Sequence, residues 1–200
     1  KSKVINGETI ALKSDAFFLL SYNQKILEQS VERSYLKFQR TKVYWLNWSE
    51  RTQRFAKYND EIVRSALVLK LLSFDKSGAI LAAATTSLPE TLGEIRNWDY
   101  RFCWLRDASM VIKTMSKLGH INITKRYLKF IIDIIPDKDE KIQIMYGING
   151  EKKLTEQILE HLQGYESSYP VRIGNAAYKQ KQHDIYGILM DVIYQQFRMF

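Results

Sequence analysis

The segment RNWDYRFCWLRDAS, residues 96–109, combines four aromatic rings, three arginines and two aspartates. A buried core has little use for so many charges, and a solvated surface has little use for the indoles. Flat faces beside hydrogen-bonding groups suit a polar, uncharged ligand, so this mixture points to a sugar. Trp104 and Asp107 are three positions apart, and one helical turn can present both on one side.

The chain on both sides of this segment has mainly helical periodicity. The spacing predicts helices over about 104–118, over about 124–135 before Pro136, and from about 183 to the end of the chain. Gly119 is expected to end the first of these as a left-handed cap. The stretch 61–74 is apolar on much of its circumference and predicts a buried helix.

Other stretches predict loops or strands. Residues 77–102 contain Pro89 and Gly93 and are expected to form a long ordered loop. Residues 137–157 predict a hairpin around Asn149 and Gly150. Residues 29–57 predict a connecting helix with Trp45 and Trp48 on one face, and residues 1–28 are β-like.

Composition excludes several classes of protein. The net charge of +8 suggests the hypothesis of nucleic-acid binding, but the cations are scattered and no zinc-finger, RRM or KH signature accompanies them. No apolar run is long enough to cross a membrane, and residues 1–10 lack the pattern of a signal peptide. A single cysteine excludes an internal disulfide and fits a reducing, cytoplasmic compartment. The three histidines lack metal-ligand spacing, so no metal or cofactor is predicted.

Three ordered motifs carry a resemblance to a known family. They are SLPETLGEIRNWDYRFCWLRDAS (87–109), MYGING (145–150) followed by LTEQIL (154–159), and GYESSYPVRIGNAAYKQKQHDIYG (164–187). Together they resemble glycoside hydrolase family 15, which contains glucoamylases, glucodextranases and trehalases. Two positions depart from the family pattern: Glu94 stands where a glycine is expected, and Ile188 where an acidic residue is expected.

The resemblance implies a mainly α fold in three parts. Residues 58–200 would form the first part of an incomplete (α/α)6 barrel, residues 29–57 a linker helix, and residues 1–28 the last strands of an N-terminal β-sandwich domain. Because helices of a partial barrel lack neighbours, we expect either an oligomer or association with the missing half-barrel. The helix that runs to residue 200 has an apolar face with no partner, which favours a truncated chain.

The resemblance also implies a sugar-binding site. Tyr100, Trp104, Arg106 and Asp107 match the family's subsite for a terminal glucose, where Asp107 would accept from sugar hydroxyls. Arg172 and Asn175 open the next motif and are candidates for a direct sugar contact. The alternative for Arg106 and Asp107 is a structural salt bridge beneath a packed indole. Asp99, Arg96 and Arg101 are expected to serve structural roles.

The implied activity is that of an inverting, exo-acting α-glucoside hydrolase that releases glucose from non-reducing ends of α-glucans. The alternatives are a trehalase of the same family and a non-catalytic carbohydrate-binding or helical interaction fragment. Inversion requires a carboxylic acid and a carboxylate roughly 6.5–9.5 Å apart. Both are expected beyond residue 200, so the isolated chain is predicted to be inactive.

Overall fold

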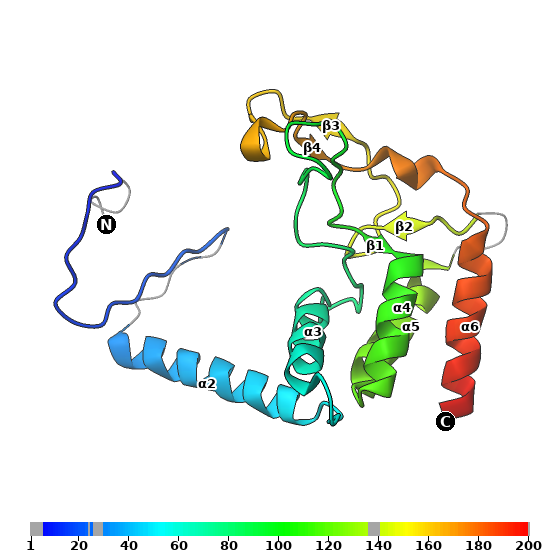
Figure 1. The fold of residues 1–200 in the computed structure, drawn as a ribbon, viewed down its shortest axis with the longest axis horizontal. Helices are drawn as coiled ribbons and strands as arrows, with labels where there is room; N and C mark the ends of the chain where they lie inside the picture. The colour runs from blue at the N-terminus through cyan, green and yellow to red at the C-terminus, as the bar shows by residue number, and fades with distance from the viewer. Residues whose placement is uncertain (1–5, 24, 26–29, 136–140, 200) are drawn as a thin grey trace. The chain divides into compact units, whose positions relative to one another are not determined.

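The structure is a computed structural model that describes residues 6–23, 25, 30–135 and 141–199. The chain divides into two compact units, Lys1–Glu50 and Arg51–Phe200, and each is described by itself (Figure 1). None of the helices in the described residues is long and apolar enough to cross a bilayer.

The first unit contains helix α2, Val31–Glu50. Trp45 and Trp48 lie on one face of this helix with ring centroids 6.3 Å apart in an edge arrangement, which confirms the shared face. Residues 6–23 form turns and irregular chain with no strand. The β-sandwich end predicted for residues 1–28 extends into positions outside the described residues, and both it and the linker role of α2 stay predictions.

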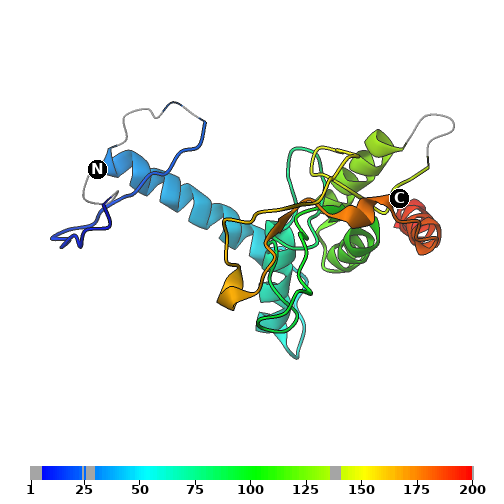
Figure 2. The same cartoon turned by 90° about the horizontal axis from the view of Figure 1, so that it is seen from above.

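The second unit is mainly helical. Its long helices are α3 (Asn59–Leu71), α4 (Leu105–Lys117), α5 (Ile121–Ile134) and α6 (Asp184–Met199). Helix α4 packs against both α5 and α6, and the three are seen nearly end-on in Figure 2. The predicted mainly α class is confirmed, whereas closure into a barrel stays a prediction.

Apolar residues at helical spacing build the core between these helices. In α4 the buried face is formed by Leu105, Ala108, Ile112 and Met115, which recur every three or four positions. Helix α5 contributes Tyr127 and Phe130, and α6 contributes Ile185, Leu189 and Val192. Gly119 follows α4 with φ of 90°, so the predicted left-handed cap is confirmed.

Helix α3 differs from the prediction. Its buried residues are Ala66 and Lys70, whereas Val68 and Leu71 are exposed. The expected burial on most sides is therefore wrong for the described residues, because α3 is covered on one side. Lys70 reaches its buried position by pairing with Asp75 at 2.6 Å, and Arg126 of α5 pairs with the same carboxylate at 2.8 Å.

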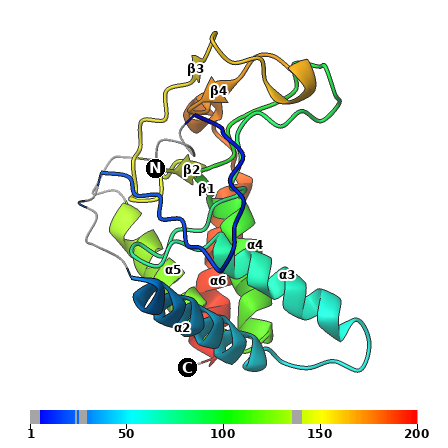
Figure 3. The ribbon, with the colours of Figure 1, turned by 90° about the vertical axis from the view of Figure 1, so that its left-hand side faces the viewer.

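Two short antiparallel strand pairs lie at one end of the helices (Figure 3). Strand β1 (Cys103–Trp104) pairs with β2 (Met145–Tyr146), and β3 (Gln157–Ile158) pairs with β4 (Arg172–Ile173). The hairpin predicted for 137–157 is wrong over its described part, 141–157, and residues 137–140 lie outside the described residues. A turn joins Gly147 to Glu151, but β2 and β3 on its two sides pair with distant segments. Short 3-10 helices, η1 (Tyr165–Ser167) and η2 (Ala176–Lys179), flank β4.

The segment between α3 and β1 is the long ordered loop that the sequence predicts. Isolated bridges join Ser73 to Ile80 and Thr86 to Asp99. The loop brings Asn97 and Asp99 into the unit, where both side chains are buried. It therefore delivers the aromatic and charged residues of 96–104 to the start of α4.

Candidate functional site

The candidate site lies where β1 runs directly into α4. The N–H of Leu105 donates to the carbonyl of Ile144 at 3.0 Å, and the hydroxyl of Tyr127 donates to the carbonyl of Leu105 at 3.2 Å. Leu105 and Ala108 point into the core. Arg106 and Asp107, between them, consequently face outward from the first turn of the helix.

Arg106 is the centre of a polar cluster on this surface. Its Nη2 donates to Oδ2 of Asp107 at 3.3 Å, and its Nη1 donates to Oε1 of Gln182 at 3.2 Å. Asp184, at the start of α6, brings Oδ2 to 3.9 Å from the same Nη1. The side chains of Arg106, Asp107 and Asp184 are 37%, 44% and 46% exposed, so a ligand can reach them.

Trp104 lies beneath the guanidinium. The Cζ of Arg106 is 5.6 Å from the centroid of the indole, within range of a cation–π interaction. The indole is partly buried against a core cluster that includes Ile144, Leu154 and Ile185, and its Nε1 is buried without an acceptor among the described residues. Trp104 therefore supports the site from below. The arrangement resembles the salt bridge over an indole that the sequence left open as an alternative, but its charged groups are exposed rather than sealed.

The remaining predicted site residues belong to different surroundings. Tyr100, before β1, is 38% exposed. Arg172 donates from Nε to the carbonyl of Asn97 at 3.0 Å and pairs with Glu156 at 3.2 Å. Asn175 is 3% exposed, donates to the carbonyl of Asp99 and accepts from the N–H of Ala177.

The structure thus separates the predicted set into two groups. Trp104, Arg106 and Asp107 come together at α4. In the part of the chain that the structure describes, no hydrogen bond or ion pair joins Arg172 or Asn175 to Arg106 or Asp107. A sugar contact by Asn175 would have to replace hydrogen bonds that its side chain already makes.

Asp99 organises this second group. It is 1% exposed and accepts from Nε and Nη2 of Arg101, both at 2.9 Å, and from the N–H of Gly174 at 3.1 Å. Its hydrogen bonds raise the pKa of the Arg101 guanidinium. Arg96 pairs separately with Glu90 at 2.6 Å. The structural roles predicted for Asp99, Arg96 and Arg101 fit these contacts.

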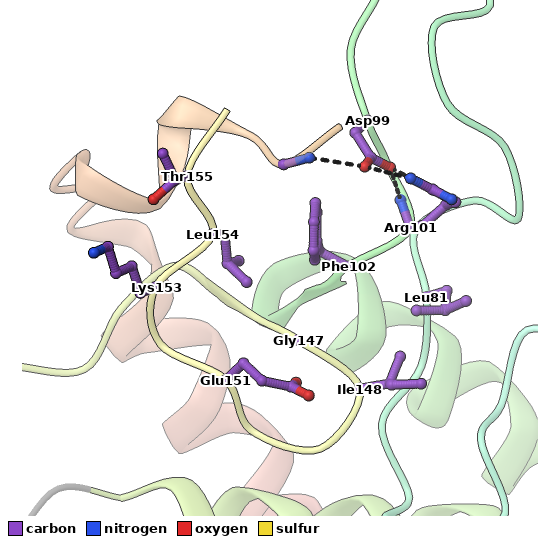
Figure 4. A pocket seen from close by; sticks show the side chains of 11 residues that line it. Leu81, Asp99, Arg101, Phe102, Gly147, Ile148, Glu151, Lys153, Leu154 and Thr155 are labelled. Atoms are coloured by element: carbon purple, nitrogen blue, oxygen red, sulfur yellow. Dashed lines mark hydrogen bonds and ion pairs between the residues drawn. The ribbon is translucent and has the colours of Figure 1, made fainter. Parts of the chain in front are cut away.

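A cavity of about 480 Å³ lies beside the Asp99 group, as Figure 4 shows. Phe102, Leu81, Ile148 and Leu154 supply apolar walls, and the charged side chains around it are Asp99, Arg101, Glu151 and Lys153. Its lining contains none of Tyr100, Trp104, Arg106 and Asp107. The cavity is therefore separate from the polar cluster at α4.

The described residues support neither a reactive thiol nor a metal site. Burial raises the pKa of the Cys103 thiol to about 12, so this sulfur stays protonated near neutral pH and serves as a core side chain. No group of three or more histidine, cysteine, aspartate or glutamate side chains among the described residues is placed to hold a metal ion.

Sequence reasoning missed Gln182 and Asp184. They lie in the polar stretch KQKQHD, residues 179–184, which immediately precedes α6. Asp184 is the first residue of that helix, where an acidic side chain also has an ordinary capping interpretation. Only the packing of α6 on α4 reveals that both side chains meet Arg106, so the sequence offered no specific signal.

Comparisons with known proteins agree with these motifs. The profile of Glycosyl hydrolases family 15 matches residues 56–199. The trehalase of Mycolicibacterium smegmatis is 39% identical over 188 residues, covering 90% of this chain and 28% of that protein. The trehalase of Thermoplasma volcanium is 40% identical over 162 residues, covering 81% and 26%. Trehalase 1 of Sulfolobus acidocaldarius is 38% identical over 176 residues, covering 87% and 30%.

The chain accordingly spans less than one third of the length of these curated relatives. No solved structure matches it.

Proposed function

Because the chain belongs to family 15 of the glycosyl hydrolases, we propose that it carries the part of a trehalose-hydrolysing enzyme that binds a terminal glucose unit. The observation that carries this proposal is the exposed cluster of Arg106 and Asp107 over Trp104, at the centre of the family motif. The trehalase names of relatives at 38–40% identity favour trehalose over the α-glucan chain that the sequence motifs put first. Polysaccharide degradation is consequently the weaker reading.

The side chains suit a glucose unit. The Asp107 carboxylate can accept from two sugar hydroxyls, and the free N–H groups of Arg106 can donate to a third oxygen. Tyr100 is 38% exposed, and its role as a stacking face for the sugar stays a prediction. Trehalose consists of two glucose units joined through their anomeric carbons, so either unit presents the free hydroxyls that this cluster would read.

Bond cleavage needs groups that these side chains do not provide. In an inverting mechanism an acid protonates the glycosidic oxygen while a base takes a proton from the attacking water, and the C–O bond breaks as the new one forms. We propose that both carboxyl groups come from polypeptide outside these 200 residues. The chain alone then binds sugar without hydrolysing it.

The exposed face of α6 supports an incomplete assembly. Tyr186, Met190, Tyr194 and Phe197 follow one another at helical spacing and are 46–80% exposed. An apolar stripe of this kind on a helix normally packs against another element. We propose that it contacts the remaining helices of the enzyme or a second copy of the chain.

Sugar titration with the purified chain tests the proposal. Trehalose, maltose and methyl α-galactoside are added while the binding-induced shift of backbone amide NMR signals at 104–107 is followed. We expect trehalose to bind, methyl α-galactoside to bind poorly because its C4 hydroxyl is inverted, and Asp107→Ala to weaken trehalose binding about 10- to 100-fold. Glucose release by the chain alone would contradict the assignment of catalysis elsewhere.

Binding that is equal for wild type and Asp107→Ala would overturn the proposed site. A second experiment distinguishes part of an enzyme from a non-catalytic carbohydrate-binding module. The region of the M. smegmatis trehalase that follows its matched segment is added to the chain, and trehalose hydrolysis is measured. Restored trehalose hydrolysis supports the enzyme, whereas sugar binding without any restored hydrolysis supports the binding module.

A further inference from the structure

Arg106 is approached by side chains from two segments that are far apart in the sequence. Asp107 is its neighbour on α4, whereas Gln182 lies two residues before α6 and Asp184 is the first residue of that helix. The side chains of Asp107 and Asp184 are 44% and 46% exposed. The α6 side of the cluster therefore has the same access to a ligand as the α4 side.

We infer that the start of α6 forms the second wall of the sugar site, with Gln182 as a positioning residue for Arg106 and Asp184 as a further sugar-binding carboxylate. This inference rests on the proposed function. It adds to that function two specificity-determining side chains.

The hydrogen bonds around Gln182 fix its orientation. A guanidinium has five N–H donors and no acceptor, so only the amide oxygen of Gln182 can face Arg106. The amide nitrogen of Gln182 donates in turn to Oε1 of Gln180 at 3.0 Å. Together with Asp107 on Nη2, this chain of hydrogen bonds holds the guanidinium from two sides. N–H groups not used by these two partners are left to donate to a ligand.

Asp184 is placed differently. At 3.9 Å its carboxylate is close enough to feel the charge of Arg106 but too far to be its hydrogen-bond acceptor. Its side chain is 46% exposed. Asp184 thus keeps lone pairs for a sugar hydroxyl while Arg106 offsets its charge, which is the same chemistry proposed for Asp107.

The Arg106 cluster is not needed to hold α4 and α6 together. Helices α4 and α6 already share a second ion pair, Lys113 with Asp191 at 3.1 Å, and a buried seam that includes Ile185 and Leu189. Asp191 is 49% exposed and, like Asp184, faces a cation on α4. It is therefore a control of similar exposure on the same helix, seven residues beyond Asp184, although Asp191 also accepts hydrogen bonds from Lys113 and Gln195.

The test compares Asp184→Asn with Asp191→Asn by trehalose titration of the whole chain. Each variant removes one carboxylate charge from α6. We expect Asp184→Asn to weaken binding about 10-fold, which corresponds to one charge-assisted hydrogen bond, and Asp191→Asn to leave it within about twofold. Equal effects of the two variants would overturn the role of Asp184.

A second measurement addresses Gln182 without sugar. The Nη1–H signal of Arg106, the group that donates to Gln182, should be slow to exchange with solvent in wild type in ¹⁵N NMR, exchange faster in Gln182→Leu, and return in Gln182→Glu, which keeps an acceptor. An unchanged signal in Gln182→Leu would overturn the positioning role.

The failures of the two proposals are distinguishable. If Asp107→Ala loses trehalose binding but Asp184→Asn does not, this inference fails and the proposed function stands. If the wild-type chain binds no sugar, the proposed function fails together with the Asp184 assignment, and the Arg106 signal still decides the role of Gln182.

Discussion

The two arginine–aspartate clusters of the second unit use the same chemistry in opposite ways. Asp99 is 1% exposed, and its carboxylate is surrounded by donors from Arg101 and Gly174. Asp107 is 44% exposed and meets a single nitrogen of Arg106 at 3.3 Å. The first cluster has little hydrogen-bonding capacity left, whereas the second retains most of it.

This difference separates stability from binding. A buried carboxylate that accepts several hydrogen bonds contributes to folding, because its donors would otherwise be left without partners. An exposed carboxylate with free lone pairs contributes little to folding but can accept from a ligand. Asp99 and Asp107 stand eight positions apart in the same motif, so position in a motif does not reveal which use applies.

The largest expected effect contrasts the two aspartates directly. Asp99→Ala should lower the free energy of unfolding by about 3 kcal/mol, because Arg101 and the N–H of Gly174 lose a charged acceptor. Asp107→Ala should change it by less than about 0.5 kcal/mol. Urea unfolding followed by circular dichroism measures both. Similar losses in the two variants would erase the proposed distinction.

Two glycines, Gly174 beside Asp99 and Gly93 in open space, test how tightly the backbone around Asp99 is packed. Gly174 has φ of +73°, and a Cβ there would collide with the carbonyl of Thr155, whereas Gly93 has φ of +80° and open space around it. We expect Gly174→Ala to cost about 2 kcal/mol and Gly93→Ala about 1 kcal/mol, since only the first adds a clash to the left-handed conformation. Thermal unfolding of both variants measures the difference, and an equal cost would show that the Asp99 cluster tolerates movement.

The smallest effect is a pH dependence that neither cluster causes. His120 is 7% exposed and lies 2.9 Å from the hydroxyl of Thr52. Burial lowers its pKa, and the charges of Arg51 and Lys70 lower it further. The unfolded chain therefore takes up a proton first as pH falls through about 6.5, and the folded state loses stability below that pH.

His120→Gln should flatten this dependence. Urea midpoints of wild type and variant are compared at about pH 7.5 and about pH 5.5, on either side of the unfolded histidine pKa. We expect the wild type to lose more stability than the variant between the two conditions. Parallel losses would assign the acid sensitivity to another group.

The sequence was sufficient for the helices and for half of the site. Helical spacing located α4, α5 and α6, because each buries one apolar face. Gly119 marked the end of α4 through its freedom to adopt positive φ. The motif around Trp104 and Asp107 located the open cluster, since side chains three positions apart on a helix share a face.

What failed depended on contacts between distant segments. The hairpin around Asn149 was not found because β2 and β3 pair with β1 and β4, and local turn signals cannot specify those partners. The exposure of Val68 and Leu71 follows from the neighbours of α3, which its own periodicity does not contain. Gln182 was missed for the same reason, because it meets Arg106 only through the packing of α6.

The β1–β2 pair has a consequence for how the site could diversify. It fastens the chain entering α4 to the segment after α5, and the contacts of Leu105 with Ile144 and Tyr127 secure the same point. The backbone that carries Trp104 and Arg106 is thus held by contacts that do not involve α6. Exchange of residues 180–184 among related proteins could therefore change which sugar is accepted while this backbone frame is kept.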